Sequence, residues 1–104
     1  MSAIALAFVN GRIRTNDVRR PMADALAITG KELALVGSSA EVRKLAGAAA
    51  RVVDLRGANV RGIPQDAVLR RGGPASFVVI APGDGGAELI RVVDGAIVAV
   101  SSAK

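Results

Sequence analysis

The sequence predicts a mainly β protein: a small β-sandwich of hairpins with one short α-helix, forming a single domain over residues 1–104. Short apolar runs alternate with turn dipeptides, which is typical of hairpins. Hydrophobic residues make up 51% of the chain, yet Phe8 and Phe77 are its only aromatic residues. We therefore expect a core of Val, Ile and Leu with Ala as filler. A length of 104 residues fits one such core.

Turn dipeptides predict three hairpins. Type I′ turns favour Asn-Gly and Asp-Gly because both central residues need positive φ, and these pairs occur at residues 10–11 and 94–95, with a similar turn at Gly30. The expected strand pairs are 3–9 with 12–15, 24–29 with 32–36, and 88–93 with 96–100. From the last turn we predict that Gly95→Val costs about 1–3 kcal/mol. The same change at Gly85, in a loop, should cost less.

The second predicted hairpin has one face of large apolar side chains, the heavy face, and one face of Ala and polar side chains, the light face. Its larger apolar residues fall at alternate positions, at Leu26, Ile28, Leu33 and Leu35. Side chains alternate across a strand, so these four residues should face the core. The other face, of Ala and polar residues, should be the outer one.

One helix is predicted after the second hairpin. Ser38 and Glu41 have the spacing of a capping box, in which each side chain accepts a hydrogen bond from the other residue's backbone N–H. The helix should run to about Ala46, with Val42 and Leu45 on its apolar face, and end at Gly47.

Further strands are expected at 51–55, 58–60 and 75–81, with a turn at Gly57. Residues 61–74 are rich in Gly, Pro and Arg and predict an irregular connection. Residues 82–86, Pro-Gly-Asp-Gly-Gly, predict a loop before the last hairpin.

The formal net charge is +5, which could attract anions. The basic residues are scattered: Arg12 and Arg14 should share a strand face, Arg19-Arg20 and Arg70-Arg71 should lie in loops, and Arg43-Lys44 on the helix. The chain has no Tyr or Trp to stack on bases and no basic recognition helix. We therefore expect solvated arginines and no nucleic-acid partner.

The chain contains no histidine and no cysteine. It thus lacks the usual ligands for zinc, copper and haem, and a disulfide framework. The apolar run at 3–9 is too short for a membrane span and has no basic leader. We expect a cytoplasmic protein without membrane contact.

None of the candidate site groups in the sequence is predicted to be catalytic, cofactor-binding or metal-binding. Asp54 could hold a metal, but a strand-end carboxylate bonding a turn explains it better. Asp66 has no second ligand nearby in sequence. The 82–86 loop lacks the Lys-Ser/Thr ending of a phosphate-binding P-loop. Ser38-Ser39 are explained by capping, and Ser101-Ser102 by a frayed tail.

The order of these segments resembles a known family. Residues 8–13 (FVNGRI), 23–28 (ADALAI), 33–37 (LALVG) and 52–60 (VVDLRGANV), followed by 75–80 (ASFVVI) and 90–98 (IRVVDGAIV), are similar to the composite β-sandwich domain of the metal-dependent amidohydrolase superfamily, most closely amidohydrolase family 3. In that family the N-terminal strands are followed by a long catalytic barrel, and strands that return after the barrel complete the sandwich. Residues 1–60 correspond to the N-terminal strands here, and residues 75–104 to the returning strands.

The resemblance also implies what is missing. Family members reach Asp-x-His-x-His on the first barrel strand, where the histidines bind metal. The nearest match here is Asp66-Ala67-Val68-Leu69-Arg70, with Val68 and Arg70 in place of histidine. Residues 61–74 would replace the entire barrel, so no metal ligand carries over.

Two functions remain open. The first is a non-catalytic structural or interaction module of unknown ligand, which would cover its exposed surface by forming a homodimer. The second is an accessory subunit or remnant of a metal-dependent amidohydrolase acting on non-peptide C–N bonds, with a separate barrel-type partner.

Overall fold

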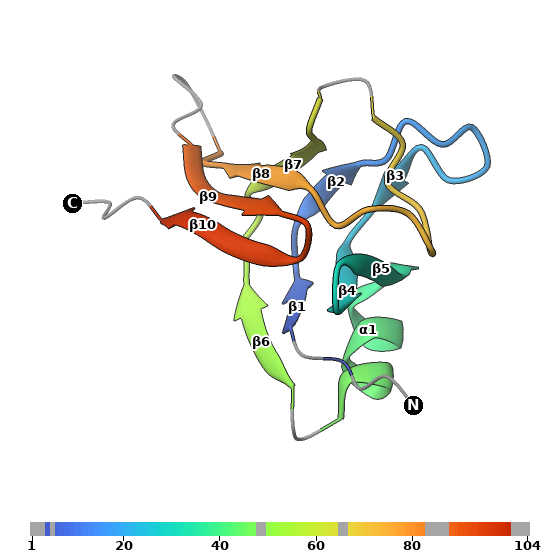
Figure 1. Ribbon diagram of the computed structural model, residues 1–104. Coiled ribbons are helices and arrows are strands. Elements are labelled where there is room, and N and C mark those ends of the chain that lie inside the picture. The colour runs from blue at the N-terminus through green and yellow to red at the C-terminus, as the bar shows by residue number, and fades with distance from the viewer. Residues whose placement is uncertain (1–3, 5, 48–49, 65–66, 83–87, 101–104) are drawn as a thin grey trace.

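A computed structural model describes residues 4, 6–47, 50–64, 67–82 and 88–100. It confirms the predicted fold class: the chain is mainly β, with two mixed sheets and one short helix. In Figure 1 the helix lies against one sheet, and the second sheet lies across the other side of the first.

The two sheets differ in size. The smaller sheet has four strands in the spatial order β5 (Glu32–Gly37), β4 (Ala25–Thr29), β1 (Leu6–Val9) and β6 (Arg51–Asp54). The larger sheet has six, in the order β10 (Ala96–Val100), β9 (Glu88–Val93), β8 (Phe77–Ile80), β7 (Asn59–Gly62), β2 (Arg12–Arg14) and β3 (Met22–Ala23). Helix α1 spans Ser39–Ala46.

The main core lies between the sheets. Phe8 from β1 meets Phe77 from β8 edge to face, with ring centroids 5.3 Å apart and planes at 89°, a favourable aromatic geometry. Both rings are fully buried. Because β8 also pairs with β7, residues after 75 are part of the same core as residues before 60.

The light face of the smaller sheet is also buried, which the sequence reasoning missed. Ala7, Val9, Ala25 and Ala27 form a second cluster with Val42 and Ala46 of α1. Small side chains on this face let the helix approach closely. Leu45, predicted to lie on the apolar face of the helix, is 50% exposed. Ala46 packs against the sheet instead.

A β-bulge changes the predicted faces of β5. Leu33 pairs with Ile28 and Leu35 pairs with Ala27, so the register shifts at the intervening residue. Leu33 therefore faces the main core, whereas Leu35 faces the helix-side cluster. The prediction that Leu33 and Leu35 share a face was wrong, because one extra residue reverses side-chain direction.

The first predicted hairpin is wrong. Strand β1 pairs with β4 and, in parallel, with β6, whereas β2 pairs with β3 and, in parallel, with β7. The Asn10-Gly11 step carries the chain from one sheet to the other. Asn10 has φ 60°, and a Cβ on Gly11 would lie 2.5 Å from Leu55 Cδ1. Glycine here serves a close approach between segments instead of a tight turn.

The other two hairpins are confirmed. Strand β4 pairs with β5 and β9 pairs with β10, both antiparallel. Asp94 and Gly95 have φ of 50° and 82°, the positive values that a type I′ turn requires. Gly85, the comparison site in our prediction, lies outside the described residues.

The helix cap is confirmed at both ends. The Glu41 backbone N–H donates to Ser38 Oγ over 3.2 Å, and the Ser38 N–H donates to Glu41 Oε1 over 3.0 Å. The bond from the Ser38 backbone N–H is the main cause that lowers the pKa of the Glu41 carboxyl below its ordinary value, and the Ser38 side chain lowers it further. Gly47 ends the helix at φ 67°.

The described residues of segment 61–74 make more backbone hydrogen bonds to the sheets than predicted. Arg61 and Gly62 belong to β7, and Leu69 is 2% exposed with its N–H donating to Thr15 O over 2.8 Å. Ala75 then joins the sheets, since its N–H donates to Lys31 O over 3.0 Å and its carbonyl accepts from Gly95 N–H over 2.9 Å. Composition alone could not show these backbone bonds.

Candidate functional site

The larger sheet positions a row of polar side chains on its outer face. In β2, Ile13 is fully buried between exposed Arg12 and Arg14, and in β7, Val60 is buried between exposed Asn59 and Arg61. This alternation sends Ile13 and Val60 into the core. The flanking residues of both strands therefore share the outer face.

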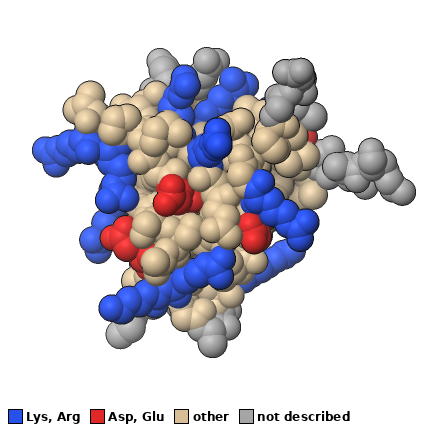
Figure 2. Space-filling model, turned by 180° about the vertical axis from the view of Figure 1, so that it is seen from behind, with Lys and Arg blue, Asp and Glu red and all other residues tan. Residues whose placement is uncertain are grey.

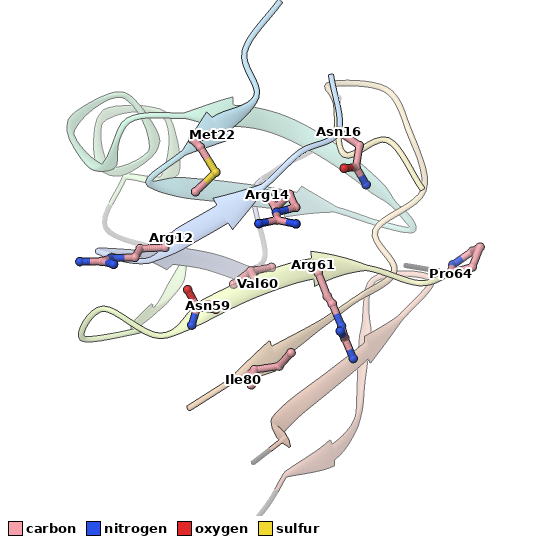
Figure 3. A pocket seen from close by; sticks show the side chains of 9 residues that line it. All are labelled: Arg12, Arg14, Asn16, Met22, Asn59, Val60, Arg61, Pro64 and Ile80. Atoms are coloured by element: carbon pink, nitrogen blue, oxygen red, sulfur yellow. The ribbon is translucent and has the colours of Figure 1, made fainter. Parts of the chain in front are cut away.

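These side chains line a groove of about 710 Å³ (Figure 3). Its lining residues come from β2, β3, β7, β8 and the adjoining loops: Arg12, Arg14, Asn16, Met22, Asn59, Val60, Arg61, Pro64 and Ile80. Figure 3 places Arg14 near the centre of the view, with Met22 on one side and Asn59 on the other. We call it the arginine groove.

The strand register sets two arginines side by side. Strands β2 and β7 run parallel, with Arg12 opposite Asn59 and Arg14 opposite Arg61. Neighbouring strands lie about 4.8 Å apart, and like charges directly opposite each other destabilise a sheet. The register therefore brings two like charges to neighbouring positions of one face, where they repel each other unless the side chains turn apart. In Figure 3 the two side chains diverge, and Arg61 extends toward β8.

Described carboxylates do not neutralise this pair by direct contact. The ion pairs among described residues are Arg20–Glu41, at 3.8 Å, and Arg91–Glu88, at 2.8 Å. Glu88 accepts two hydrogen bonds from Arg91, and these lower its pKa more than the weaker attraction of Arg61 does. The attraction between Arg61 and Glu88 therefore acts without a direct contact between the two side chains.

The remaining lining residues supply amide groups and apolar surface. Asn16 sits at φ 60°, and its Nδ2 donates to Ala67 O over 3.1 Å, which fixes the loop beside β2. Met22 is 53% exposed, and Ile80 is half-buried. The groove thus combines guanidinium and amide donors with an apolar wall. Among the described lining residues there is no carboxylate, hydroxyl or amine side chain.

About half of this site is predictable from the sequence. Arg12 and Arg14 share one strand face and are exposed, which agrees with the prediction of solvated arginines. Arg61 and Asn59 were missed because the predicted first hairpin paired residues 12–15 with 3–9, whereas β2 pairs in parallel with β7. The available signal was the matching alternation of residues 12–14 and 59–61, each a buried aliphatic residue between two polar ones.

The other candidate residues lie elsewhere. Asp54 is exposed and its Oδ1 accepts from Arg56 N–H over 2.9 Å. That backbone bond is the main cause of its lowered pKa, followed by Asn10. The turn interpretation of Asp54 is therefore confirmed.

The serines act in local structure. Ser38 caps α1, and Ser39 Oγ accepts from Asn10 N–H over 2.9 Å. Asp66, residues 83–86 and Ser101-Ser102 lie outside the described residues. Within the described part of the chain, no three Asp or Glu residues cluster as metal ligands would.

Basic residues on the face shown in Figure 2 do not form a comparable patch. Their side chains are spread mainly around the edge of the molecule, with acidic groups among them. Of the described helices, none has the length and apolar character needed to span a bilayer.

Comparison with known proteins gives a structural neighbour and no family. No protein-family model matches the chain, and no curated protein matches it significantly. The crystal structure of BT9727_2919 from Bacillus thuringiensis is similar at TM-score 0.53 and 29% identity, over 57% of this chain and 78% of that one. It is a structural genomics target with no stated function. This likeness agrees with the β-rich fold.

Proposed function

We propose that this chain is a non-catalytic β-sandwich module that binds an anionic ligand through the arginine groove. The Arg14–Arg61 pair is the observation that carries the proposal. Two like charges in register cost stability, and none of the described carboxylates contacts either. Such a cost is accepted at sites where function requires it.

The chemistry of the groove favours binding over catalysis. Arginine remains protonated and only donates hydrogen bonds, and an amide is a poor proton acceptor. A general base or a nucleophile would need a carboxylate, a hydroxyl or an amine. The described lining residues supply donors and apolar contacts, which suit recognition of a ligand better than its chemical conversion.

One feature of the fold supports descent from an amidohydrolase composite domain. Strands β7 and β8 flank the segment in which the resemblance would place the missing barrel. They are antiparallel neighbours with Gly62 opposite Phe77, and Ile63 N–H donates to Ser76 O over 3.1 Å. A domain could be removed at 63–76 without breaking a strand pair. The second candidate is therefore an accessory subunit or remnant of such an enzyme, with a separate barrel partner. Recovery of hydrolysis on mixing with a barrel-only protein would favour it.

We also propose a cytoplasmic homodimer that pairs through β10. This edge strand has no charged residue, and Val98 and Val100 are 57% and 66% exposed. An uncharged edge is a template for strand addition, and antiparallel pairing with a second copy closes under two-fold symmetry. Sedimentation should give a dimer, and Val98→Lys should give monomers. A monomeric wild-type chain would contradict this arrangement.

The binding proposal is tested by thermal denaturation with three kinds of anion: pyrophosphate, succinate and a short oligothymidylate. At least one should raise the melting temperature, since a ligand at 100 times its Kd adds about 2.7 kcal/mol. The rise should vanish in Arg14→Gln/Arg61→Gln and persist in Arg51→Gln, an exposed strand arginine on the smaller sheet. No rise with any anion, or a rise kept by the double variant, would contradict the proposal.

A further inference from the structure

We infer that the arginine groove takes a phosphate monoester, with its phosphate between Arg14 and Arg61 and its organic group along Met22 and Ile80. This inference deepens the proposed function and rests on it. It names the anion and the way it is held.

Charge is the first argument for a phosphate. Arg14 and Arg61 present two positive charges from adjacent strand positions, and Arg12 adds a third on β2. A phosphate monoester carries about −1.5 to −2 charges at pH 7, with three acceptor oxygens on one atom. It can neutralise both guanidinium groups together, whereas a single carboxylate or sulfate ester carries one charge.

Hydrogen-bond geometry is the second argument. Each guanidinium offers a planar fork that matches two phosphate oxygens. The two forks leave β2 and β7 on the same face, so they can approach one phosphorus from two sides. Asn59, opposite Arg12 in the register, adds an amide at the same surface.

The size and lining of the groove argue for an organic group. A volume of about 710 Å³ lies in the range of small-molecule sites, about 300–1,000 Å³, and exceeds the needs of free phosphate. Met22 and Ile80 supply an apolar wall. Single-stranded nucleic acid is disfavoured because its bases need aromatic platforms, and both aromatic residues of this chain are buried in the core.

The pH dependence of binding should come from the ligand. The titratable side chains among the described lining residues are all arginines, Arg12, Arg14 and Arg61, and guanidinium groups in general do not titrate between pH 5 and 8. Glu88 on β9 attracts Arg61, and its hydrogen bonds with Arg91 are the main cause that holds its pKa below the ordinary value. The second ionisation of a phosphate monoester falls near pH 6.

Calorimetric titration with phenyl phosphate and phenyl sulfate tests the inference. The two probes share their ring, but only the phosphate becomes a dianion. We expect phenyl phosphate to bind roughly ten times more tightly at pH 7.5 than at pH 5, and phenyl sulfate to bind weakly at both. Arg14→Gln and Arg61→Gln should each weaken binding of phenyl phosphate by about tenfold or more, and Arg51→Gln should leave it unchanged.

The variants should fold, which keeps the test decisive. Both arginines are exposed, and replacing either removes a like-charge repulsion, so neither should lower the melting temperature. Equal binding of the two probes, or binding independent of pH between 5 and 7.5, would overturn the phosphate assignment. If succinate or oligothymidylate binds through Arg14 while phenyl phosphate does not, the phosphate assignment fails and the proposed function stands. If no anion binds, both fail.

Discussion

Gly95 offers a sharp test of how the two sheets are joined. Its φ is 82°, and a Cβ added there would overlap the Gly30 carbonyl oxygen and lie 3.1 Å from Lys31 Cα. Gly57 is a matched control, because its φ is 85° and an added Cβ would meet no atom within 4 Å. Replacing each by alanine therefore separates backbone strain from the clash between hairpins.

The expected magnitudes follow from these two terms. A non-glycine residue in this backbone region costs about 1–3 kcal/mol, and both variants should lose this amount. Forcing extra volume into a packed contact costs about 1–3 kcal/mol more, and only Gly95→Ala meets that clash. A difference of 1 kcal/mol shifts the melting temperature of a domain of this size by about 4–8 °C.

Urea denaturation followed by far-ultraviolet circular dichroism measures both variants, since the chain has no Tyr or Trp to report by fluorescence. Gly57→Ala should lower the midpoint, and Gly95→Ala should lower it further. Equal midpoints would refute the close approach of the β9–β10 turn to the β4–β5 turn.

Three more perturbations probe the fold. Thr15 is 1% exposed, and its hydroxyl donates to Arg20 O and accepts from Asp17 N–H; Thr15→Val should cost about 1–3 kcal/mol in denaturant melts, and a loss as large in Thr15→Ser would show that the hydroxyl is not the cause. The folded-state pKa of Glu41 is lowered, so its stabilisation is present above the unfolded pKa of about 4.5 and is lost as pH falls through the folded value. Wild type should thus exceed Glu41→Gln in urea midpoint at pH 6 and approach it at pH 3, and a gap unchanged with pH would contradict this assignment. A chain stopped after Gly73 loses β8 and the Phe8–Phe77 contact and should show no cooperative transition; a melt like that of the full chain would show that the two halves are separate units.

Local sequence signals predicted the local structure well. The β4–β5 and β9–β10 hairpins and the capped helix each depend on residues no more than twelve positions apart. Turn chemistry and capping act within that distance, so the sequence indicates them directly.

Long-range pairing was the part that the sequence could not predict. Asn10-Gly11 has the composition of a hairpin turn, yet the two strands that it connects lie in different sheets. Strand β1 pairs in parallel with β6, and β2 pairs in parallel with β7. Parallel pairing depends on contacts some 45 residues apart and leaves no turn signal. The arginine groove was hidden for the same reason, because Arg14 and Arg61 become neighbours only through that pairing.

Burial of the alanine face was missed for a related reason. Ala25 and Ala27 are uninformative in sequence, since alanine suits both a surface and a close helix contact. Only the position of α1 against β4 and β1 decides between them.

The central claim is that the outer face of the larger sheet binds an anion at Arg14 and Arg61. Amide chemical shifts of the ¹⁵N-labelled chain, recorded while phenyl phosphate is added at pH 7.5, test it most directly. We predict saturable shifts confined to β2, β7 and the adjacent ends of β3 and β8. Shifts centred on α1 or on the β4–β5 hairpin, or no saturable shift at all, would contradict the claim.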